Sequence, residues 1–330
     1  MRGGKSGSCA LGCDITYMIE IKESVSLAPF TVYKIGGPAR YFVEARRPED
    51  FEDAIRFGRS GGVPFFILGT GSNILVSDEG FSGVVIRAAN DEIEIRGEAL
   101  SAAAGARMAQ AVAAASKAEL AGFEWGIGIP GTIGGSVRGN AGCFGGEMQD
   151  VVEKVVAIEG ELGKIKEFGG SECMFAYRDS VFKHAPEWIV AEVTLMLKKG
   201  NQEAIRSRMQ KIIQERASKQ DIGTQCAGCI FKNISWEEIP NKEKLIADFP
   251  DFAQFIDRMH MPASFLIDQA GLKEERIGSI VISPKHANFF VNEGGGSADD
   301  VKKLIACVKE EVKKKFQVSI KEEIQYVGFR

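Results

Sequence analysis

The stretch that most constrains the fold of this chain runs from Gly126 to Gly146 and reads GIGIPGTIGGSVRGNAGCFGG. Nine of its 21 residues are glycine. Glycine loses more conformational freedom on folding than any other residue, so this density in a folded chain requires a reason. Backbone N–H groups that no Cβ shields can converge on a pyrophosphate, which predicts a loop that holds a nucleotide cofactor. The alternative is a set of tight turns in an ordinary β-rich domain.

A second glycine-rich stretch lies upstream and reads ILGTGSNILV over residues 67–76. A helix over 48–61 and a buried strand over 65–68 are predicted before it, an order typical of nucleotide-binding units. However, GTGSN is not the GxGxxG pattern, and strands over 74–76 and 84–86 are predicted where a helix should follow. An ordinary Rossmann fold is therefore disfavoured. We expect the two loops to bind one ligand from two sides.

Composition excludes several classes of protein. The chain has 330 residues, 26% of them charged, and a net charge of -4 without a dense basic stripe, so nothing indicates nucleic-acid binding. No apolar run approaches the roughly 18 residues that a membrane span needs. Seven cysteines without regular spacing argue against a disulfide framework. We therefore expect a cytoplasmic protein with reduced thiols and no nucleic-acid or membrane partner.

A change in composition near residue 200 predicts a domain boundary. The expected segments are an extension without regular structure over 1–26, which includes Cys9 and Cys13, a first domain over 27–200 with subdomains 27–88 and 89–200, and a second domain over 201–330. Residues 31–45 predict two short strands broken by Gly36-Gly37-Pro38. A final amphipathic helix is predicted over 298–316 and a closing strand over 318–327.

Two acidic residues and one arginine are candidates for chemistry. Arg178 lies among aromatic residues in FAYRDSVF, and a guanidinium in apolar surroundings needs an anionic partner. That partner is either a ligand or a neighbouring acid such as Asp179. Glu322 and Glu323 are consecutive in the closing strand and so point to opposite faces. An inward carboxylate is a candidate for proton chemistry, and a solvated surface charge is the alternative.

The sequence also contains one CxxC motif, formed by Cys226 and Cys229. This spacing occurs in redox dithiols and in zinc sites. There is no second CxxC and the three histidines are scattered, so we expect no metal. A thioredoxin-like dithiol requires a helix after the motif, whereas IFKN predicts a strand. Two coincidental thiols remain the alternative.

Seven motifs, in this order, resemble those of the UDP-N-acetylenolpyruvoylglucosamine reductase family. They are YKIGGPARYFVEA, ILGTGSNILVSDEGF, GIPGTIGGSVRGNAGCFGGE, FAYRDSVFK, CAGCIFKN, KHANFFVN and KEEIQYVG. The resemblance covers about Leu27 to Gly328, and the chain is similar to the shorter of the family's two types, which lacks a tyrosine-bearing insertion. It implies an α+β fold: an FAD-binding domain of the vanillyl-alcohol-oxidase (PCMH-like) class, followed by a C-terminal α+β substrate-binding domain.

The resemblance also implies an activity. The family reduces enolpyruvyl-UDP-N-acetylglucosamine to UDP-N-acetylmuramate in peptidoglycan precursor synthesis, with non-covalent FAD as cofactor and NADPH as co-substrate. Hydride goes to C3 of the enolpyruvyl group and a proton to C2. We expect a monomer whose partners are the UDP-sugar and NADPH. The alternatives are another FAD-dependent alcohol or sugar oxidase of the same class, and a non-catalytic FAD module that senses redox state through the CxxC.

The implied catalytic residues are Arg178, Cys229 and Glu323. Arg178 matches the arginine of the family's YRDS motif. Cys229 stands where the family usually has serine, and Glu323 matches a glutamate usually preceded by proline, so that the choice between Glu322 and Glu323 depends on alignment. The implied substrate-binding residues are Tyr177, Lys219, Asn233 and Gln269. The implied cofactor-binding residues are Gly69, Thr70, Gly71, Ser72, Asn73, Ile129, Gly131, Thr132, Gly134, Gly135, Asn140 and Gly142.

Overall fold

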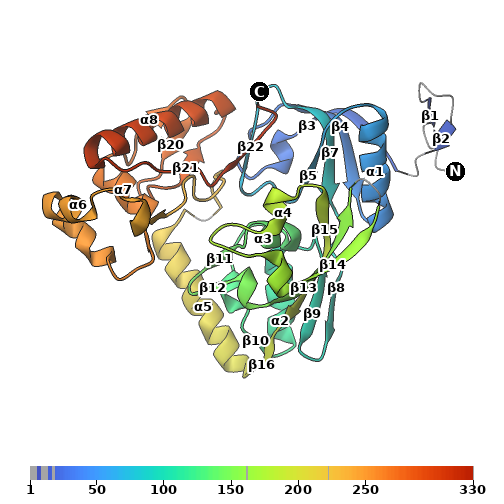
Figure 1. The fold of residues 1–330 in the computed structure, drawn as a ribbon, viewed down its shortest axis with the longest axis horizontal. Helices are drawn as coiled ribbons and strands as arrows, with labels where there is room; N and C mark the ends of the chain where they lie inside the picture. The colour runs from blue at the N-terminus through green and yellow to red at the C-terminus, as the bar shows by residue number, and fades with distance from the viewer. Residues whose placement is uncertain (1–5, 9–13, 17–18, 161–162, 222, 330) are drawn as a thin grey trace. The chain divides into compact units, whose positions relative to one another are not determined.

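The computed structural model describes residues 6–8, 14–16, 19–160, 163–221 and 223–329, and these residues form two compact units. The first unit comprises Met1–Ser26, Pro38–Thr70 and Phe81–Ser218; the second comprises Leu27–Gly37, Gly71–Gly80 and Lys219–Arg330. Figure 1 shows the elements of both units. Two short segments from the N-terminal half of the chain therefore belong with the C-terminal third.

Much of the expected extension, with Cys9 and Cys13, lies outside the described residues. Its described parts contain three strands: β1 (Ser6–Ser8), β2 (Asp14–Thr16) and β3 (Lys22–Ser26). Strands β1 and β2 pair with each other, and β3 pairs antiparallel with β4 (Pro38–Ala45). Residues 22–26 are thus part of the first sheet.

The first sheet of unit one has the strand order β3-β4-β7-β5. Strands β4 and β5 (Phe65–Leu68) both run parallel to β7 (Phe81–Ala88), and α1 (Pro48–Ser60) connects them. The predicted helix is confirmed. Its start is stabilised because proline suits the first turn and the Asp50 carboxylate accepts hydrogen bonds from the N–H groups of Arg46 and Arg47. Its buried residues Phe51, Ala54 and Ile55 pack against this sheet.

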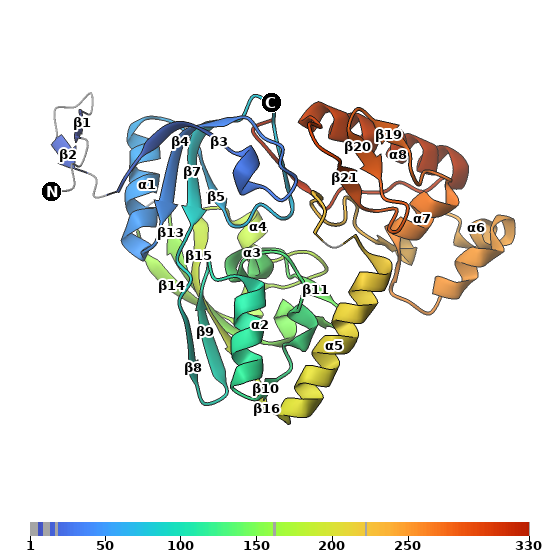
Figure 2. The same cartoon turned by 180° about the vertical axis from the view of Figure 1, so that it is seen from behind.

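The second sheet of unit one is antiparallel, with the order β14-β13-β15-β9-β8. Figure 2 shows α2 beside β9. The strands are β8 (Ile93–Arg96), β9 (Ala99–Ala103), β13 (Val152–Glu159), β14 (Ile165–Gly169) and β15 (Trp188–Met196), with the short pairs β10 (Leu120–Ala121) with β16 (Lys198–Lys199) and β11 (Gly142–Cys143) with β12 (Gly146–Glu147). The helices are α2 (Met108–Lys117), α3 (Ile133–Arg138), α4 (Val181–His184) and α5 (Gln202–Lys219), with 3-10 turns η2 (Glu124–Gly126), η3 (Met148–Asp150) and η4 (Gly170–Cys173).

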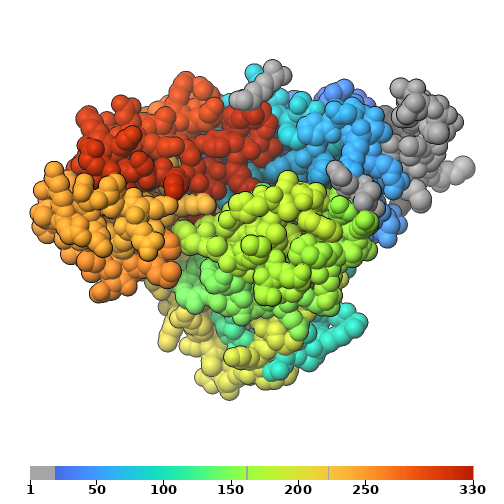
Figure 3. Space-filling model, in the orientation of Figure 1, coloured from blue at the N-terminus to red at the C-terminus, as the bar shows by residue number. Residues whose placement is uncertain are grey.

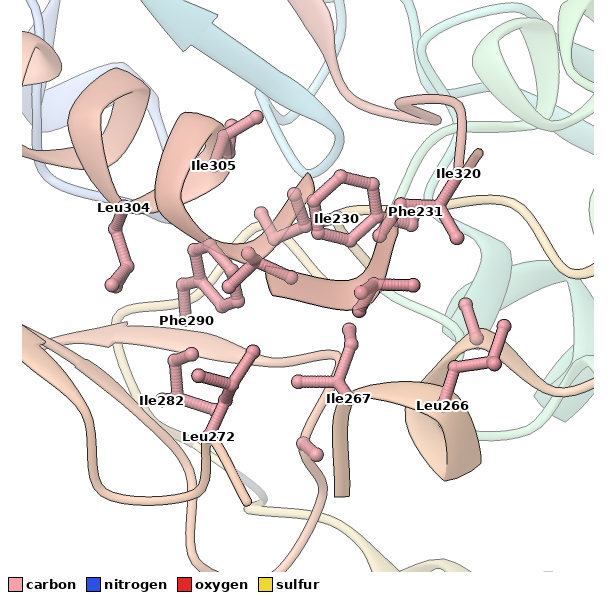
Figure 4. Packing of buried hydrophobic residues seen from close by; sticks show 14 of the residues in the cluster. Ile230, Phe231, Leu266, Ile267, Leu272, Ile282, Phe290, Leu304, Ile305 and Ile320 are labelled. Atoms are coloured by element: carbon pink, nitrogen blue, oxygen red, sulfur yellow. The ribbon is translucent and has the colours of Figure 1, made fainter. Parts of the chain in front are cut away.

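Unit two is built around α8 (Ala298–Phe316), whose bounds match the predicted helix. Its core contains large buried residues from 230–231, α7, β20, β21 and α8 (Figure 4). The strands are β6 (Ile74–Val76), β17 (Ile234–Ser235), β18 (His260–Met261), β19 (Arg276–Ile277), β20 (Ile280–Ile282), β21 (Phe290–Asn292) and β22 (Gln325–Val327). The other helices and 3-10 turns are η1 (Ala28–Phe30), η5 (Trp236–Glu238), α6 (Lys242–Asp248), η6 (Pro250–Phe255) and α7 (Ala263–Gln269). In the space-filling view, α8 (red) and α6 (orange) contribute to the surface (Figure 3).

Two predicted strands were wrong in extent. Residues 31–37 contain no strand, because Lys34 has a φ of 57° and the Thr31 hydroxyl bridges the carbonyls of Ala28 and Ile35 in a turn. The closing strand is confined to β22, since residues before it hydrogen-bond to residues 230–232 only in isolated contacts. Within the described residues, no helix combines the length and the apolar character needed to cross a membrane.

Helix α8 receives a cap from a residue far away in the sequence. The Asp78 carboxylate accepts hydrogen bonds from the N–H groups of Ala298, at 2.9 Å, and Asp299, at 3.3 Å. The first N–H groups of a helix have no partner within it, and a negative charge there is also favourable. This contact ties the loop after β6 to the C-terminal part of unit two.

We expect Asp78→Ala to lower the free energy of unfolding by about 1–2 kcal/mol, the scale for losing a helix cap. Equilibrium urea denaturation followed by circular dichroism measures this change. Asp78→Asn keeps an acceptor oxygen and should lose less. If the alanine variant is as stable as the parent protein, the cap contributes nothing.

Candidate active site

The two glycine-rich loops meet within unit one. A Cβ added to Gly69 would lie 2.8 Å from Thr132 Oγ1, closer than real Cβ atoms come to their neighbours. Thr132 is fixed in turn, because its hydroxyl accepts a hydrogen bond from the N–H of Gly135 at 3.2 Å and caps α3. Gly69 must therefore be glycine for the loops to approach each other. Gly131, with a φ of 149°, precedes Thr132 in a backbone conformation that favours glycine.

The residues at this meeting point fit a phosphate-bearing cofactor. Thr70 Oγ1 is buried and has no hydrogen-bond partner among the described residues. A buried hydroxyl without a partner is unfavourable by about 1–3 kcal/mol, so a ligand that accepts a hydrogen bond from it would remove this penalty. The Thr70 hydroxyl lies next to the close approach of Gly69 and Thr132. FAD phosphates at this place would accept its hydrogen bond.

Asn140, predicted to bind the cofactor, is completely buried and hydrogen-bonded to protein groups. Its Nδ2 donates to the carbonyl of Ala176, at 3.0 Å, and to Glu147, at 3.2 Å. Its Oδ1 accepts from the N–H of Gln149 at 3.0 Å. These bonds join the second glycine-rich loop to the hairpin that carries Arg178.

Arg178 lies in the two-residue loop of a short hairpin. The N–H and carbonyl groups of Ala176 and Asp179 exchange two hydrogen bonds, at 3.1 and 3.0 Å, which leaves Tyr177 and Arg178 as the loop. Arg178 has a φ of 55°, a left-handed conformation that is uncommon for residues other than glycine and asparagine. Such conformations concentrate at functional sites. The turn holds the guanidinium over the ring of Tyr177, 5.3 Å from its centre.

The Arg178 guanidinium donates to the carbonyl oxygen of Gly142, at 2.9 Å, in the second glycine-rich loop. The Asp179 carboxylate, which the sequence offers as the alternative partner of Arg178, lies 2.8 Å from His184 Nε2. Burial raises the pKa of the neighbouring Cys143 thiol, and the positive charges of Arg216 and Arg178 oppose that rise. Arg178 therefore adds positive charge beside the loop that is predicted to hold the flavin.

Unit two brings three predicted site residues onto adjacent segments. The N–H of Glu323 donates to the carbonyl of Ile230, the residue after Cys229, at 2.7 Å. On the other side, Asn73 accepts from the N–H of Gln325 at 3.1 Å, and β22 continues parallel to β6. The segment with Glu323 thus lies between the segment with Cys229 and the end of the first glycine-rich loop. Of that loop, Gly69 and Thr70 belong to unit one, and Gly71, Ser72 and Asn73 to unit two.

The two consecutive glutamates have different surroundings. Glu322 forms an ion pair with Lys309 of α8, at 3.0 Å, and its backbone bridges to Phe231. Its carboxylate is therefore engaged with the helix of its own unit. Glu323 stays the predicted catalytic residue, and the ion pair of Glu322 with Lys309 is consistent with that choice.

The two cysteines of the CxxC also differ. Cys226 is buried, and burial raises the pKa of its thiol to about 12. Cys229 is half-buried, and neither cysteine forms a disulfide. The thiolate is the reactive form of cysteine, so Cys226 is poorly suited to redox exchange near neutral pH. This contrast disfavours a dithiol sensor and leaves Cys229 as the accessible thiol.

The predicted substrate-binding residues are distributed over both units. Tyr177 lies in the Arg178 hairpin, and Lys219 is the last residue of α5. Asn233 and Gln269 lie at opposite ends of α7: Asn233 Oδ1 accepts from the N–H of Ala263 at 3.2 Å, and Gln269 is the last residue of the helix.

Asn288 was missed in the sequence analysis as a residue that shapes the site. It is buried, and its amide accepts from the N–H of Phe231, at 2.9 Å, and donates to the carbonyl of the same residue, at 2.8 Å. These two hydrogen bonds fix the segment that follows Cys229. The signal that could have identified Asn288 is its position in KHANFFVN, one of the seven motifs that carry the resemblance.

Comparison with known proteins shows which families the two parts of the chain are similar to. Residues 39–169 match the family model described as an FAD binding domain, and residues 220–327 match the one described as the C-terminal domain of UDP-N-acetylenolpyruvoylglucosamine reductase. Together with the two glycine-rich loops, the matches define the chain as an FAD-dependent oxidoreductase. The predicted class, an FAD-binding domain followed by a C-terminal α+β domain, is confirmed.

Full-length relatives give the particular family. The UDP-N-acetylenolpyruvoylglucosamine reductase of Solibacter usitatus is 34% identical over 310 residues, which cover 94% of this chain and 97% of the relative. That of Carboxydothermus hydrogenoformans is 37% identical, covering 93% of this chain and 94% of the relative. The crystal structure of the reductase from Thermus caldophilus superposes with a TM-score of 0.75 at 31% identity, over 94% of this chain and 100% of the other. This chain belongs to the UDP-N-acetylenolpyruvoylglucosamine reductase family.

Proposed function

We propose that this chain catalyses the NADPH-dependent reduction of enolpyruvyl-UDP-N-acetylglucosamine to UDP-N-acetylmuramate, a step of peptidoglycan precursor synthesis. The observation that carries the proposal is the adjacency of Cys229 and Glu323 in the unit that matches the family's C-terminal domain. The residues that we propose as proton donor and carboxylate lie on neighbouring segments joined by a backbone hydrogen bond. An unrelated flavin oxidase has no reason to place a thiol and a carboxylate in this way.

The FAD would be held by the two glycine-rich loops, with Gly69, Thr70 and Thr132 nearest to its phosphates. The close approach of the loops and the buried Thr70 hydroxyl support this assignment. When bound, the flavin supplies two-electron chemistry between NADPH and C3 of the enolpyruvyl group. The protein must bind both substrates, stabilise the charge that develops, and deliver one proton.

Arg178, Glu323 and Cys229 divide these tasks. Addition of hydride at C3 leaves negative charge at C2, delocalised into the substrate carboxylate as an enolate. Arg178 stabilises this charge through its planar guanidinium, which can pair with both carboxylate oxygens. Glu323 assists either in its protonated form or by orienting Arg178. Cys229 then donates its proton to C2, for which a thiol is a stronger acid than the serine usual in the family.

We propose Tyr177, Lys219, Asn233 and Gln269 as contacts of the UDP-sugar. We further propose that the protein acts as a cytoplasmic monomer without nucleic-acid or membrane partners. The net charge of -4 supports only the absence of a nucleic-acid partner. Light scattering after size-exclusion chromatography tests the oligomeric state.

The activity is tested by anaerobic mixing of the purified protein with NADPH and then with the enolpyruvyl sugar nucleotide. We expect the flavin absorbance to bleach with NADPH and to return with the sugar nucleotide. Nuclear magnetic resonance of the product formed in D₂O should show a solvent deuteron at C2. Return of the absorbance with oxygen but not with the sugar nucleotide would instead indicate an oxidase.

The cofactor itself gives a separate prediction. We expect the purified protein to be yellow and acid denaturation to release FAD into the supernatant, because nothing in the proposed roles requires a covalent link. Chromatography of the supernatant identifies the flavin. If no FAD is found in either fraction, the flavoprotein proposal fails. If the flavin precipitates with the protein, only the non-covalent part fails.

A further inference from the structure

Asn73 contacts the segment of Glu323 in two ways. Its carbonyl accepts a hydrogen bond from the N–H of Gln325 at 3.1 Å, and its Nδ2 donates to the carbonyl of Glu323 at 3.4 Å. Asn73 is also the last residue of the glycine-rich loop over 69–73. One residue therefore joins the proposed flavin loop to the backbone that carries the proposed catalytic carboxylate.

We propose that Asn73 is a positioning residue through which the flavin loop fixes the backbone of Glu323. The proposal rests on the function proposed above, from which it takes the roles of FAD and Glu323. When the loop is ordered by the cofactor, Asn73 is held, and both of its hydrogen bonds then constrain the Glu323 segment. Without FAD the same bonds are attached to a looser loop.

The strands that follow make this connection stiff. In the parallel pair of β6 and β22, Gln325 is opposite Ile74 and Tyr326 is opposite Leu75. Leu75 is completely buried in the core of unit two, and the N–H of Ser77 donates to the carbonyl of Val327 at 2.9 Å. A shift of Asn73 is therefore passed to the Glu323 segment, because the buried strand pair cannot slide to absorb it.

The position of Glu323 matters because a small displacement of a catalytic group slows the reaction. A misplacement of about 1 Å can slow a reaction about 10²-fold. On its other side, Glu323 is held by the carbonyl of Ile230, next to Cys229. Asn73 thus supplies the second of two backbone restraints on Glu323, and it is the one that FAD can influence.

Hydrogen exchange tests the connection without any sugar nucleotide. Addition of FAD to the apoprotein should slow exchange of the amides over 324–327 about tenfold or more in the parent protein. Asn73→Asp keeps the size of the side chain but places an acceptor against the Glu323 carbonyl, and Asn73→Ala removes the donor. Both variants should lose most of this FAD-dependent protection. The control Glu79→Ala, at an exposed residue after β6 that has no proposed role in the site, should retain it.

A double-mutant cycle tests the consequence for catalysis. At saturating FAD, Asn73→Asp should slow reoxidation of the flavin by the enolpyruvyl sugar about tenfold more than it slows reduction of the flavin by NADPH. In the Glu323→Ala background the same change should have no further effect, because a residue that acts through Glu323 needs it. Additive effects, or equal protection of the 324–327 amides in Asn73→Asp and parent protein, would overturn the proposal. FAD-dependent protection without sugar turnover would instead refute only the proposed function.

Discussion

Replacement of Cys229 by alanine is expected to stop product formation while leaving reduction of the flavin by NADPH intact. Only the second half-reaction needs a proton at C2, so the loss should fall there and amount to about 10²–10⁴-fold, the usual range for general acid catalysis. Stopped-flow reoxidation of the reduced flavin and steady-state product formation measure the two steps. Since hydride transfer can precede protonation, reoxidation can survive while product with a solvent deuteron at C2 fails to accumulate.

Two control variants separate proton donation from mere packing. Cys229→Ser should keep substantial activity, because a hydroxyl fits the same space and can donate. Cys226→Ala should be close to neutral, since the Cys226 thiol is buried and its pKa is raised to about 12. Iodoacetamide should inactivate the parent protein but largely spare Cys229→Ser, because the thiolate is the attacking species. If Cys226→Ala lost turnover and Cys229→Ala kept it, the assignment would be reversed.

Replacement of Arg178 by lysine is expected to slow reoxidation by the enolpyruvyl sugar about 10²-fold or more, with flavin reduction by NADPH preserved. Lysine keeps the charge but not the planar pair of donors that a carboxylate accepts. The magnitude is that for the loss of one group that stabilises developing charge. Rapid-mixing measurements of the two half-reactions provide the comparison.

Arg208→Lys is the matched control for this prediction. Arg208 donates to the carbonyl of Phe144 at 3.0 Å, so it contacts the same glycine-rich loop that Arg178 contacts through Gly142. Its replacement should leave both half-reactions near the parent rates. If Arg178→Lys slowed both half-reactions equally, Arg178 would support the loop and not act on the substrate.

Local features of the fold could be predicted from sequence because their causes lie within a few residues. Helix α1 follows from a proline and two acidic residues at its start, and α8 begins at Ser297, whose hydroxyl accepts from the N–H of Asp300. Long-range pairing leaves no such local signal. The closing strand was therefore predicted too long, and the place of residues 27–37 and 71–80 in unit two was not foreseen.

The candidate site shows the same limit. Motifs located Arg178, Cys229 and Glu323 as separate stretches, but they could not decide between Glu322 and Glu323. The ion pair between Glu322 and Lys309 depends on how α8 packs, which no pattern around the glutamates reveals. The left-handed conformation of Arg178 was equally invisible, because arginine carries no preference for it.

The pairing of β6 with β22 has a consequence for how the protein is made. Residues 325–327 are synthesised about 250 residues after their partner strand β6. Domains generally begin to fold during synthesis, starting from the N-terminus. Here Tyr33, Ile35 and Leu75 belong to a core completed by residues beyond 219, so these side chains have no core partners in the nascent chain until those residues have been synthesised. A ribosome stalled before residue 219 should therefore hold a chain that exposes these apolar residues to chaperones.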